Sequence, residues 1–136
     1  MGQQQVKIGV IGAGHLGRYH IECISRIEGF SLIGFYDIDK ARAGEISTKY
    51  NLTSFESPEA LMESVEALCI VTPTVAHFDM AVTAIEAGKH LFIEKPLTSD
   101  PVTSRKLADL IAAKGVVGRV GHVERYNPAF IAAQKM

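Results

Sequence analysis

The chain has 136 residues, a formal net charge of -1 and a hydrophobic content of 47%. This length and composition suffice for one domain with its own core, without help from disulfides or metals. A charge near zero, without a basic run, argues against nucleic acid or an anionic membrane as partner. Small molecules are therefore the expected ligands.

Targeting and redox features point to the cytoplasm. The stretch MGQQQVKIGVIGAG lacks the charged start and long apolar core of a signal peptide. No apolar run approaches the roughly 20 residues of a membrane span. Cys23 and Cys69 lie in apolar segments without metal-ligand spacing, so we expect two buried free thiols and no metal site.

Short apolar runs alternate with amphipathic segments along the chain. Six runs have the character of strands that are covered on both faces: 6–11, 31–36, a weaker one at 53–55, 67–71, 90–93 and 116–120. In each of three intervening segments, the apolar residues would lie on one face of a helix. These faces are Leu16, Tyr19, Cys23 and Ile27; Phe78, Ala81, Val82 and Ile85; and Leu107, Leu110 and Ile111.

Residues at the helix ends support these assignments. Gly88 and Gly115 follow the second and third helical segments, where a left-handed cap residue is favoured. Asp100 and Pro101 occupy the N-cap and first positions of the third segment. The order of elements is thus β-α-β-α-β, twice.

This alternation predicts an α/β fold with a doubly wound, parallel, six-stranded sheet, the Rossmann dinucleotide-binding fold, over residues 1–121. Ligands of this fold bind beyond the carboxyl ends of the strands. The loops to examine therefore follow Ile11, Tyr36, Val71, Ile93 and Val120.

The first of these loops is Gly12-Ala13-Gly14-His15-Leu16-Gly17, a G-x-G-x-x-G motif between a strand and a helix. Gly12 permits a tight turn, Gly14 lets the backbone approach a pyrophosphate, and Gly17 lets the helix pack close to the strand. All six residues are candidate cofactor contacts. The alternative is a glycine-rich turn without a ligand.

The second loop contains Asp37, which stands 20 positions after Gly17. An acidic residue at this spacing is expected to bind the adenine ribose hydroxyls and to repel a 2′-phosphate, so NAD is favoured over NADP. Arg42 is near enough to serve a phosphate instead. Asp39 is expected to be the N-cap of the next helix.

The third and fourth loops carry further polar residues. Thr72 and Pro73 precede His77, which reads equally well as an exposed residue of a capped helix start or as a cofactor contact. The run 90–93 ends in Glu94-Lys95-Pro96, where the proline restricts Lys95 to extended backbone. The alternative is a surface Glu–Lys ion pair of little energetic value. We also expect the Lys95–Pro96 peptide to be cis.

The motifs GAGHLG, the D of FYD, TPTVAH, IEKP and GHVERYNP resemble, in order and spacing, the N-terminal half of the Gfo/Idh/MocA family of glucose-fructose oxidoreductases and inositol dehydrogenases. The ending GHVERYNP is similar to that of nucleotide-sugar 3-dehydrogenases. The resemblance implies an NAD-dependent oxidoreductase that moves a hydride between nicotinamide and a carbinol of a sugar, polyol or sugar nucleotide.

The resemblance also implies roles for individual residues. Lys95 matches the lysine that lies beside the nicotinamide and bonds to the substrate hydroxyl, and Glu94 matches its acidic neighbour. Thr72, Pro73 and His77 match the stretch that lines the nicotinamide side. Arg125 falls on the substrate side.

Complete members of this family have a second α/β domain that supplies much of the substrate pocket and usually the oligomer contact. We therefore expect residues 122–136 to begin the connection and helix toward such a domain, and the full-length protein to be a homo-oligomer. The chain alone should bind NAD without dehydrogenase activity. The alternative function is a non-catalytic NAD-binding module that senses redox state.

Overall fold

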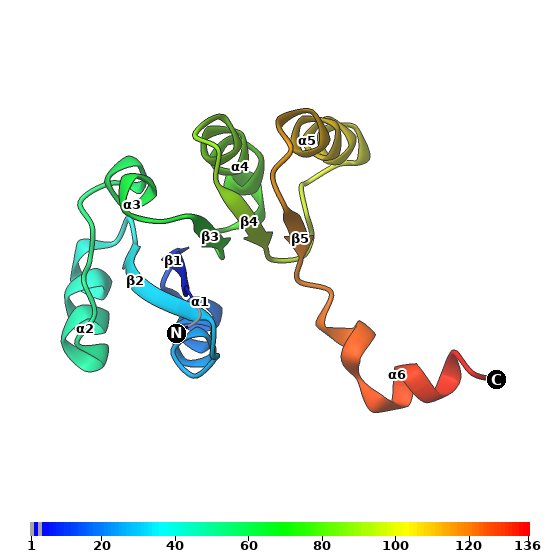
Figure 1. Ribbon diagram of the computed structural model, residues 1–136, viewed down its shortest axis with the longest axis horizontal. Helices are drawn as coiled ribbons and strands as arrows, with labels where there is room; N and C mark the ends of the chain where they lie inside the picture. The colour runs from blue at the N-terminus through cyan, green and yellow to red at the C-terminus, as the bar shows by residue number, and fades with distance from the viewer. Residues whose placement is uncertain (1, 3) are drawn as a thin grey trace.

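The computed structural model describes residue 2 and residues 4–136, and it contains one parallel sheet (Figure 1). The strand order is β2-β1-β3-β4-β5. The strands are β1 (Val6–Ile11), β2 (Phe30–Tyr36), β3 (Ala67–Ile70), β4 (His90–Ile93) and β5 (Gly118–Val120). The predicted parallel α/β fold is confirmed, and the order reverses between β1 and β3, which places a topological switch point there.

The sheet has five strands among the described residues, so the prediction of a sixth at 53–55 is wrong. This segment makes a single parallel bridge, between Phe35 and Ser54, on the outer side of β2. Asn51 ends the preceding helix in left-handed conformation, and Ser57 caps the following one. The chain between two helix ends so close together is too short to pair along a whole strand.

Helices cover both faces of the sheet (Figure 1). On one face, α1 (His15–Ile24) and α2 (Lys40–Tyr50) pack on Val10 and Phe35. On the other face, α3 (Pro58–Ser64), α4 (His77–Glu86) and α5 (Pro101–Lys114) pack on Leu68 and Ile93. Successive side chains of a strand point to opposite faces, so each strand contributes to both cores.

The predicted helix caps are confirmed. Asp39 Oδ1 accepts a hydrogen bond of 3.0 Å from the Arg42 amide. Asp100 Oδ1 accepts one of 2.9 Å from the Thr103 amide, and hydrogen bonds from Thr103 lower the pKa of Asp100. Gly88 and Gly115 have φ values of 72° and 68°, a region in which a side chain would be strained.

Helix α1 buries a different face from the one predicted. The buried residues are Gly17, Ile21 and Ile24, whereas the face containing Leu16 and Cys23 is exposed. The prediction counted apolar side chains, but the face in contact with the sheet is the one whose glycine allows close approach. Consequently Cys23 is an exposed thiol, and the expectation of burial holds for Cys69 only.

The faces predicted for α4 and α5 are confirmed, with Ala81, Ile85 and Leu107 fully buried. Burial raises the pKa of the Cys69 thiol well above its usual range, and the charge of Glu94 adds to the effect. Among the helices that the structure describes, none combines the length and the apolar character needed to cross a membrane.

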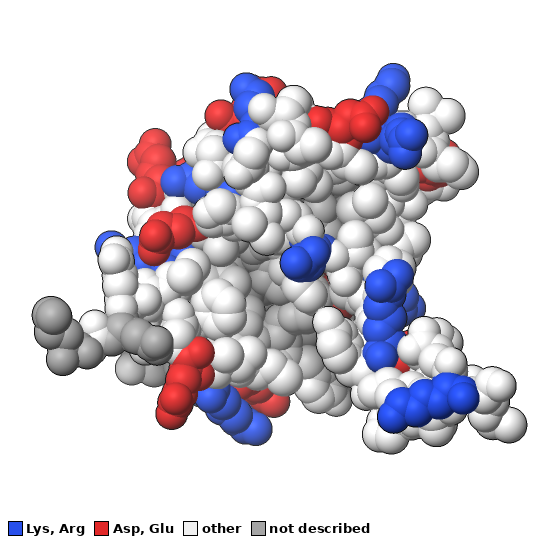
Figure 2. Space-filling model, turned by 45° about the vertical axis from the view of Figure 1, so that its right-hand side comes forward, with Lys and Arg blue, Asp and Glu red and all other residues white. Residues whose placement is uncertain are grey.

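Residues 122–136 extend away from the sheet as a short 3₁₀ helix, η2 (Val123–Tyr126), and α6 (Pro128–Ala133) (Figure 1). Every residue of this segment is exposed, including Tyr126, Phe130 and Ile131. On the face drawn in Figure 2, Lys and Arg side chains are interspersed with Asp and Glu along the upper and left edges, and a positively charged side chain stands among uncharged residues near the centre.

Gly34 allows the segment 53–55 to lie against β2. A methyl group on Gly34 would lie 2.5 Å from the Thr53 carbonyl oxygen and from the Phe55 ring. Gly34→Ala should therefore lower the free energy of unfolding by about 2 kcal/mol, as overpacking does, measured by urea denaturation. Gly44→Ala, in an open position of α2, is the control and should raise it by roughly 0.5–1 kcal/mol. Equal stability of Gly34→Ala and the wild type would contradict this packing.

Candidate functional site

A cleft of about 700 Å³ opens at the carboxyl edge of the sheet, around the switch point. The turn after β1 forms one wall, and the loops after β2, β3 and β4 form the others. Every predicted cofactor-binding or catalytic residue except Ala13 lines this cleft, whereas Arg125, expected on the substrate side, does not. Ala13 is fully buried, and only its backbone takes part, as described below. Met80 also lines the cleft and lies outside the motifs identified in the sequence.

The three glycines of the β1–α1 turn have different structural roles. Gly12 has a φ of 94°, and a methyl group on it would lie 2.6 Å from the Val71 carbonyl oxygen. A methyl group on Gly17 would collide with the carbonyl oxygen of Gly12. Gly14, in contrast, has open space around it and offers no side-chain cap to α1. The first amides of α1 therefore remain available to an anionic ligand.

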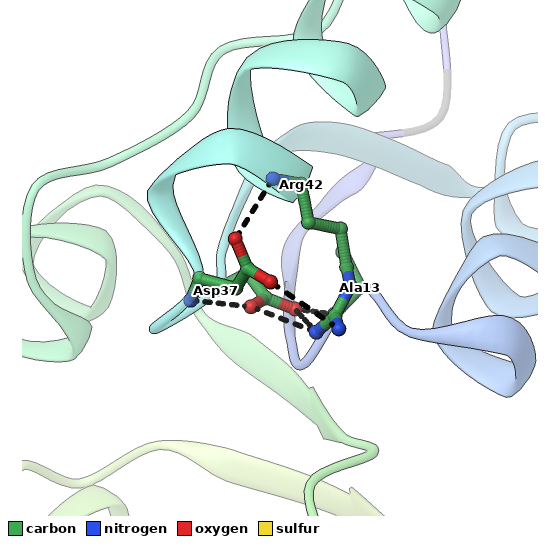
Figure 3. Close-up of polar contacts among 4 residues, drawn as sticks. Ala13, Asp37 and Arg42 are labelled. Carbon is green, nitrogen blue, oxygen red and sulfur yellow. Dashed lines mark hydrogen bonds and ion pairs between the residues drawn. The ribbon is translucent and has the colours of Figure 1, made fainter.

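Asp37 connects the end of β2 to this turn (Figure 3). Its side chain is 4% exposed, and Oδ2 accepts a hydrogen bond of 2.7 Å from the Ala13 amide. Oδ1 accepts one of 2.8 Å from the Asp39 amide. A buried carboxylate requires such donors, because it loses its hydration on folding. The predicted ribose-binding residue thus also holds the glycine turn in place.

Arg42 pairs with this carboxylate, a contact that the sequence did not indicate. Its Nη1 lies 3.2 Å from Asp37 Oδ1, and its Nη2 lies 3.4 Å from Asp39 Oδ2 (Figure 3). Arg42 is partly exposed and lines the cleft. Its positive charge offsets part of the repulsion that Asp37 would exert on a 2′-phosphate.

His77 is buried, which excludes the alternative of an exposed histidine at a capped helix start. Its Nε2 lies 2.8 Å from the Thr72 carbonyl oxygen, and its Nδ1 lies 3.0 Å from that of Pro96. Both partners are carbonyl oxygens on different loops, and the ring lies within hydrogen-bond distance of each. The ring therefore ties the loop after β3 to the loop after β4. The expected cis peptide between Lys95 and Pro96 is present at the second of these loops.

Thr72 leaves a polar atom without a partner. Its Oγ1 is buried and has no hydrogen bond with any residue in the described part of the chain. Buried hydroxyls are ordinarily satisfied, so this atom and the open space at Gly14 fit a cleft whose ligand supplies contacts at both places. Among the residues that the structure describes, no three His, Cys, Asp or Glu side chains lie close enough together to hold a metal ion.

Glu94 has hydrogen-bond partners, whereas the side chain of its neighbour Lys95 has none among the described residues. Glu94 is 6% exposed; its Oε1 lies 2.8 Å from His20 Nε2, and its Oε2 accepts a hydrogen bond of 3.0 Å from the Lys95 amide. The Lys95 side chain is exposed, and its ammonium makes no ion pair with any described residue. The Glu–Lys ion pair considered from the sequence is therefore absent from the described residues. His20 was not predicted, because nothing in the sequence aligns it with Glu94.

These features define a class of protein. A parallel α/β sheet, a glycine turn that leads into a helix, an acidic residue at the end of β2 and open space over the helix start form a dinucleotide-binding Rossmann domain. The profile of the Gfo/Idh/MocA family, described as an oxidoreductase family with an NAD-binding Rossmann fold, matches residues 6–122. The chain belongs to this family and corresponds to its NAD-binding domain.

Named relatives support the assignment. The chain is 39% identical over 124 residues to UDP-N-acetylglucosamine 3-dehydrogenase of Acidithiobacillus ferrooxidans, covering 91% of this chain and 39% of that protein. It is 34% identical over 137 residues to scyllo-inositol 2-dehydrogenase (NAD(+)) of Bacillus subtilis, covering 98% and 40%. A solved structure of the Acidithiobacillus enzyme superimposes with a TM-score of 0.90 at 36% identity, covering 98% and 42%. The chain thus spans about two fifths of these relatives.

The different duties of Gly14 and Gly17 can be separated by alanine substitution. Gly17→Ala should lower the free energy of unfolding by about 2 kcal/mol or more, because the methyl group meets backbone that cannot move aside. Gly14→Ala should leave the free energy of unfolding nearly unchanged and lower the affinity for NAD, because its methyl group enters the open space beside α1. Urea denaturation and calorimetric titration measure the two effects. Loss of stability in Gly14→Ala with intact NAD binding would contradict the assignment.

Proposed function

We propose that this chain binds NAD in the cleft and is the cofactor-binding part of a dehydrogenase that acts on a carbinol of a sugar, polyol or sugar nucleotide. The observation that carries the proposal is the Lys95 ammonium, which is unpaired among the described residues and lines the same cleft as the glycine turn. A module that only senses NAD has no need of a free amine there. Lys95 therefore favours catalysis over the redox-sensing alternative.

The residues at the two ends of the cleft suit the two ends of the cofactor. In this proposal Asp37 holds the adenosine ribose, and the α1 amides at Gly14 hold the pyrophosphate. Thr72, Pro73 and Glu94 then surround the nicotinamide, where the unpartnered Thr72 hydroxyl provides a hydrogen bond. When bound, NAD supplies the chemistry of hydride acceptance and donation.

Lys95 has the role of the acid–base group. Oxidation of a carbinol requires the hydroxyl proton to leave as the hydride departs, and Lys95 Nζ would receive that proton. Reduction would use the same group in reverse. His77 supports this role by holding the Lys95–Pro96 loop against Thr72.

The substrate class is proposed from the relatives, whose names specify a UDP-sugar and an inositol. Those proteins are more than twice as long as the matched region, so a further domain would complete the substrate pocket. The exposed η2 and α6 would lead toward it, with Arg125 on the substrate side. We also propose that the full-length protein is a homo-oligomer.

Cofactor preference tests the proposed role of Asp37. NAD should bind more tightly than NADP by about tenfold, or ~1.4 kcal/mol, because the carboxylate accepts ribose hydroxyls and opposes a 2′-phosphate. Asp37→Ala should narrow the difference by weakening NAD and leaving Arg42 unpaired. Asp39→Asn is the control, because asparagine retains the helix cap. Calorimetric titration of both cofactors measures these affinities, and equal wild-type affinities would overturn the assignment.

Substitution of Lys95 separates chemistry from binding. In the full-length protein, Lys95→Ala should lower kcat by ~10²- to 10⁴-fold, the range for general acid–base groups, with NAD affinity nearly unchanged. Steady-state kinetics with sugars, polyols and UDP-sugars, together with NAD titration, provides the measurement. Lys89→Ala is the control, because it removes a lysine at the far end of β4. Wild-type turnover in Lys95→Ala would rule out the acid–base role.

A further inference from the structure

We infer that His20 is a positioning residue for the catalytic end of the cleft: it holds the Glu94 carboxylate on the α1 side of the sheet and so keeps Lys95 free of an ion pair. The importance of this for catalysis rests on the proposed role of Lys95. The contacts of His20 themselves join α1 to β3 and to the end of β4.

Three contacts fix the His20 ring. Its Nε2 lies 2.8 Å from Glu94 Oε1, and its Nδ1 lies 3.3 Å from the Cys69 sulfur. The ring packs against Phe92 with centroids 5.5 Å apart. These partners come from β3, β4 and the residue after β4, so the imidazole of a helix residue is held by the sheet on three sides.

The contact with Cys69 fits a proton on His20 Nε2, the ring atom that faces Glu94. Burial raises the pKa of the Cys69 thiol far above neutrality, so this group remains protonated and can donate its S–H to Nδ1. A neutral ring that accepts at Nδ1 carries its proton on Nε2. That proton points at Glu94 Oε1. The thiol thus fixes the orientation of the ring, and the ring fixes the position of the carboxylate.

The remaining contacts of Glu94 confine its carboxylate. Oε2 accepts a hydrogen bond from the Lys95 amide, and a methyl group on Gly121 would lie 2.9 Å from the same oxygen. His20 is the only side chain among the described residues that forms a hydrogen bond with the carboxylate. Removing it would free Oε1 while the carboxylate stays next to Lys95 in the chain.

A free Glu94 carboxylate would have an obvious partner. The Lys95 ammonium is exposed and unpaired among the described residues, and a partly buried carboxylate that loses a donor gains by meeting a cation. An ion pair would keep the amine protonated and occupied. His20 thus acts on Lys95 through Glu94, without touching the cleft itself.

The reactivity of the Lys95 amine tests this inference in the 136-residue chain. Acetylation with isotope-labelled reagent near neutral pH, followed by mass spectrometry, gives the rate at Lys95 relative to the exposed Lys135. His20→Leu should lower this ratio by about two- to fivefold, the effect of a partly exposed ion pair. His20→Gln should preserve it, because its amide can donate to Glu94 and accept from Cys69.

A double variant shows whether the effect passes through the carboxylate. His20→Leu combined with Glu94→Gln should return to the wild-type ratio, because glutamine cannot form the ion pair. His20→Asn, whose shorter amide does not reach Glu94, gives a polar variant with the same expected loss if His20→Leu does not fold. An unchanged ratio in a folded His20→Leu or His20→Asn chain, or a double variant that stays low, would overturn the inference.

Titration of the same samples with NAD distinguishes a failure of the proposed NAD-binding function from a failure of the proposed role of His20. Failure of the wild-type chain to bind NAD would overturn the proposed function, whereas the acetylation ratios would still decide the role of His20. Conversely, tight NAD binding with unchanged ratios would leave the cofactor site intact and reject the positioning role.

Discussion

The close approach of helix α1 to the sheet is the constraint on which the site depends. It is possible only because Gly17 has no side chain to meet the Gly12 carbonyl oxygen, and because Gly12 can adopt a positive φ against Val71. The same approach brings His20 to Cys69 and to Glu94. A helix held further out would take His20 away from the Glu94 carboxylate. Backbone sterics at two glycines therefore set both ends of the site.

Two carboxylates face the cleft, and each is stabilised in the same way. Asp37 accepts from the Ala13 amide and pairs with Arg42, while Glu94 accepts from the Lys95 amide and from His20. A buried charge without partners would cost several kcal/mol, so both groups are tied to backbone and to a basic side chain. Lys95 is left exposed beside them. Because both carboxylates already have partners, the Lys95 amine remains available.

Most of the fold could be predicted from the sequence because its signals are local. Apolar runs marked the strands of the sheet, and Asp39, Asp100, Gly88 and Gly115 marked helix ends through bonds within one turn of the chain. The failures occurred where backbone geometry, rather than the pattern of apolar side chains, decides. The face of α1 depends on a glycine contact with the turn, and pairing of 53–55 depends on the room left by Asn51 and Ser57.

For the site, the sequence by itself determined which residues reach the carboxyl edge of the sheet, because strand order and loop position follow from the alternation of elements. The glycine turn, Asp37, Thr72 and Lys95 are all identified in this way. Only the tertiary structure decided their partners: Arg42 on Asp37, two carbonyl groups on His77, and His20 with Cys69 behind Glu94. The reason is physical. Hydrogen bonds of about 3 Å depend on the relative placement of whole helices and strands, which packing fixes and local sequence does not encode.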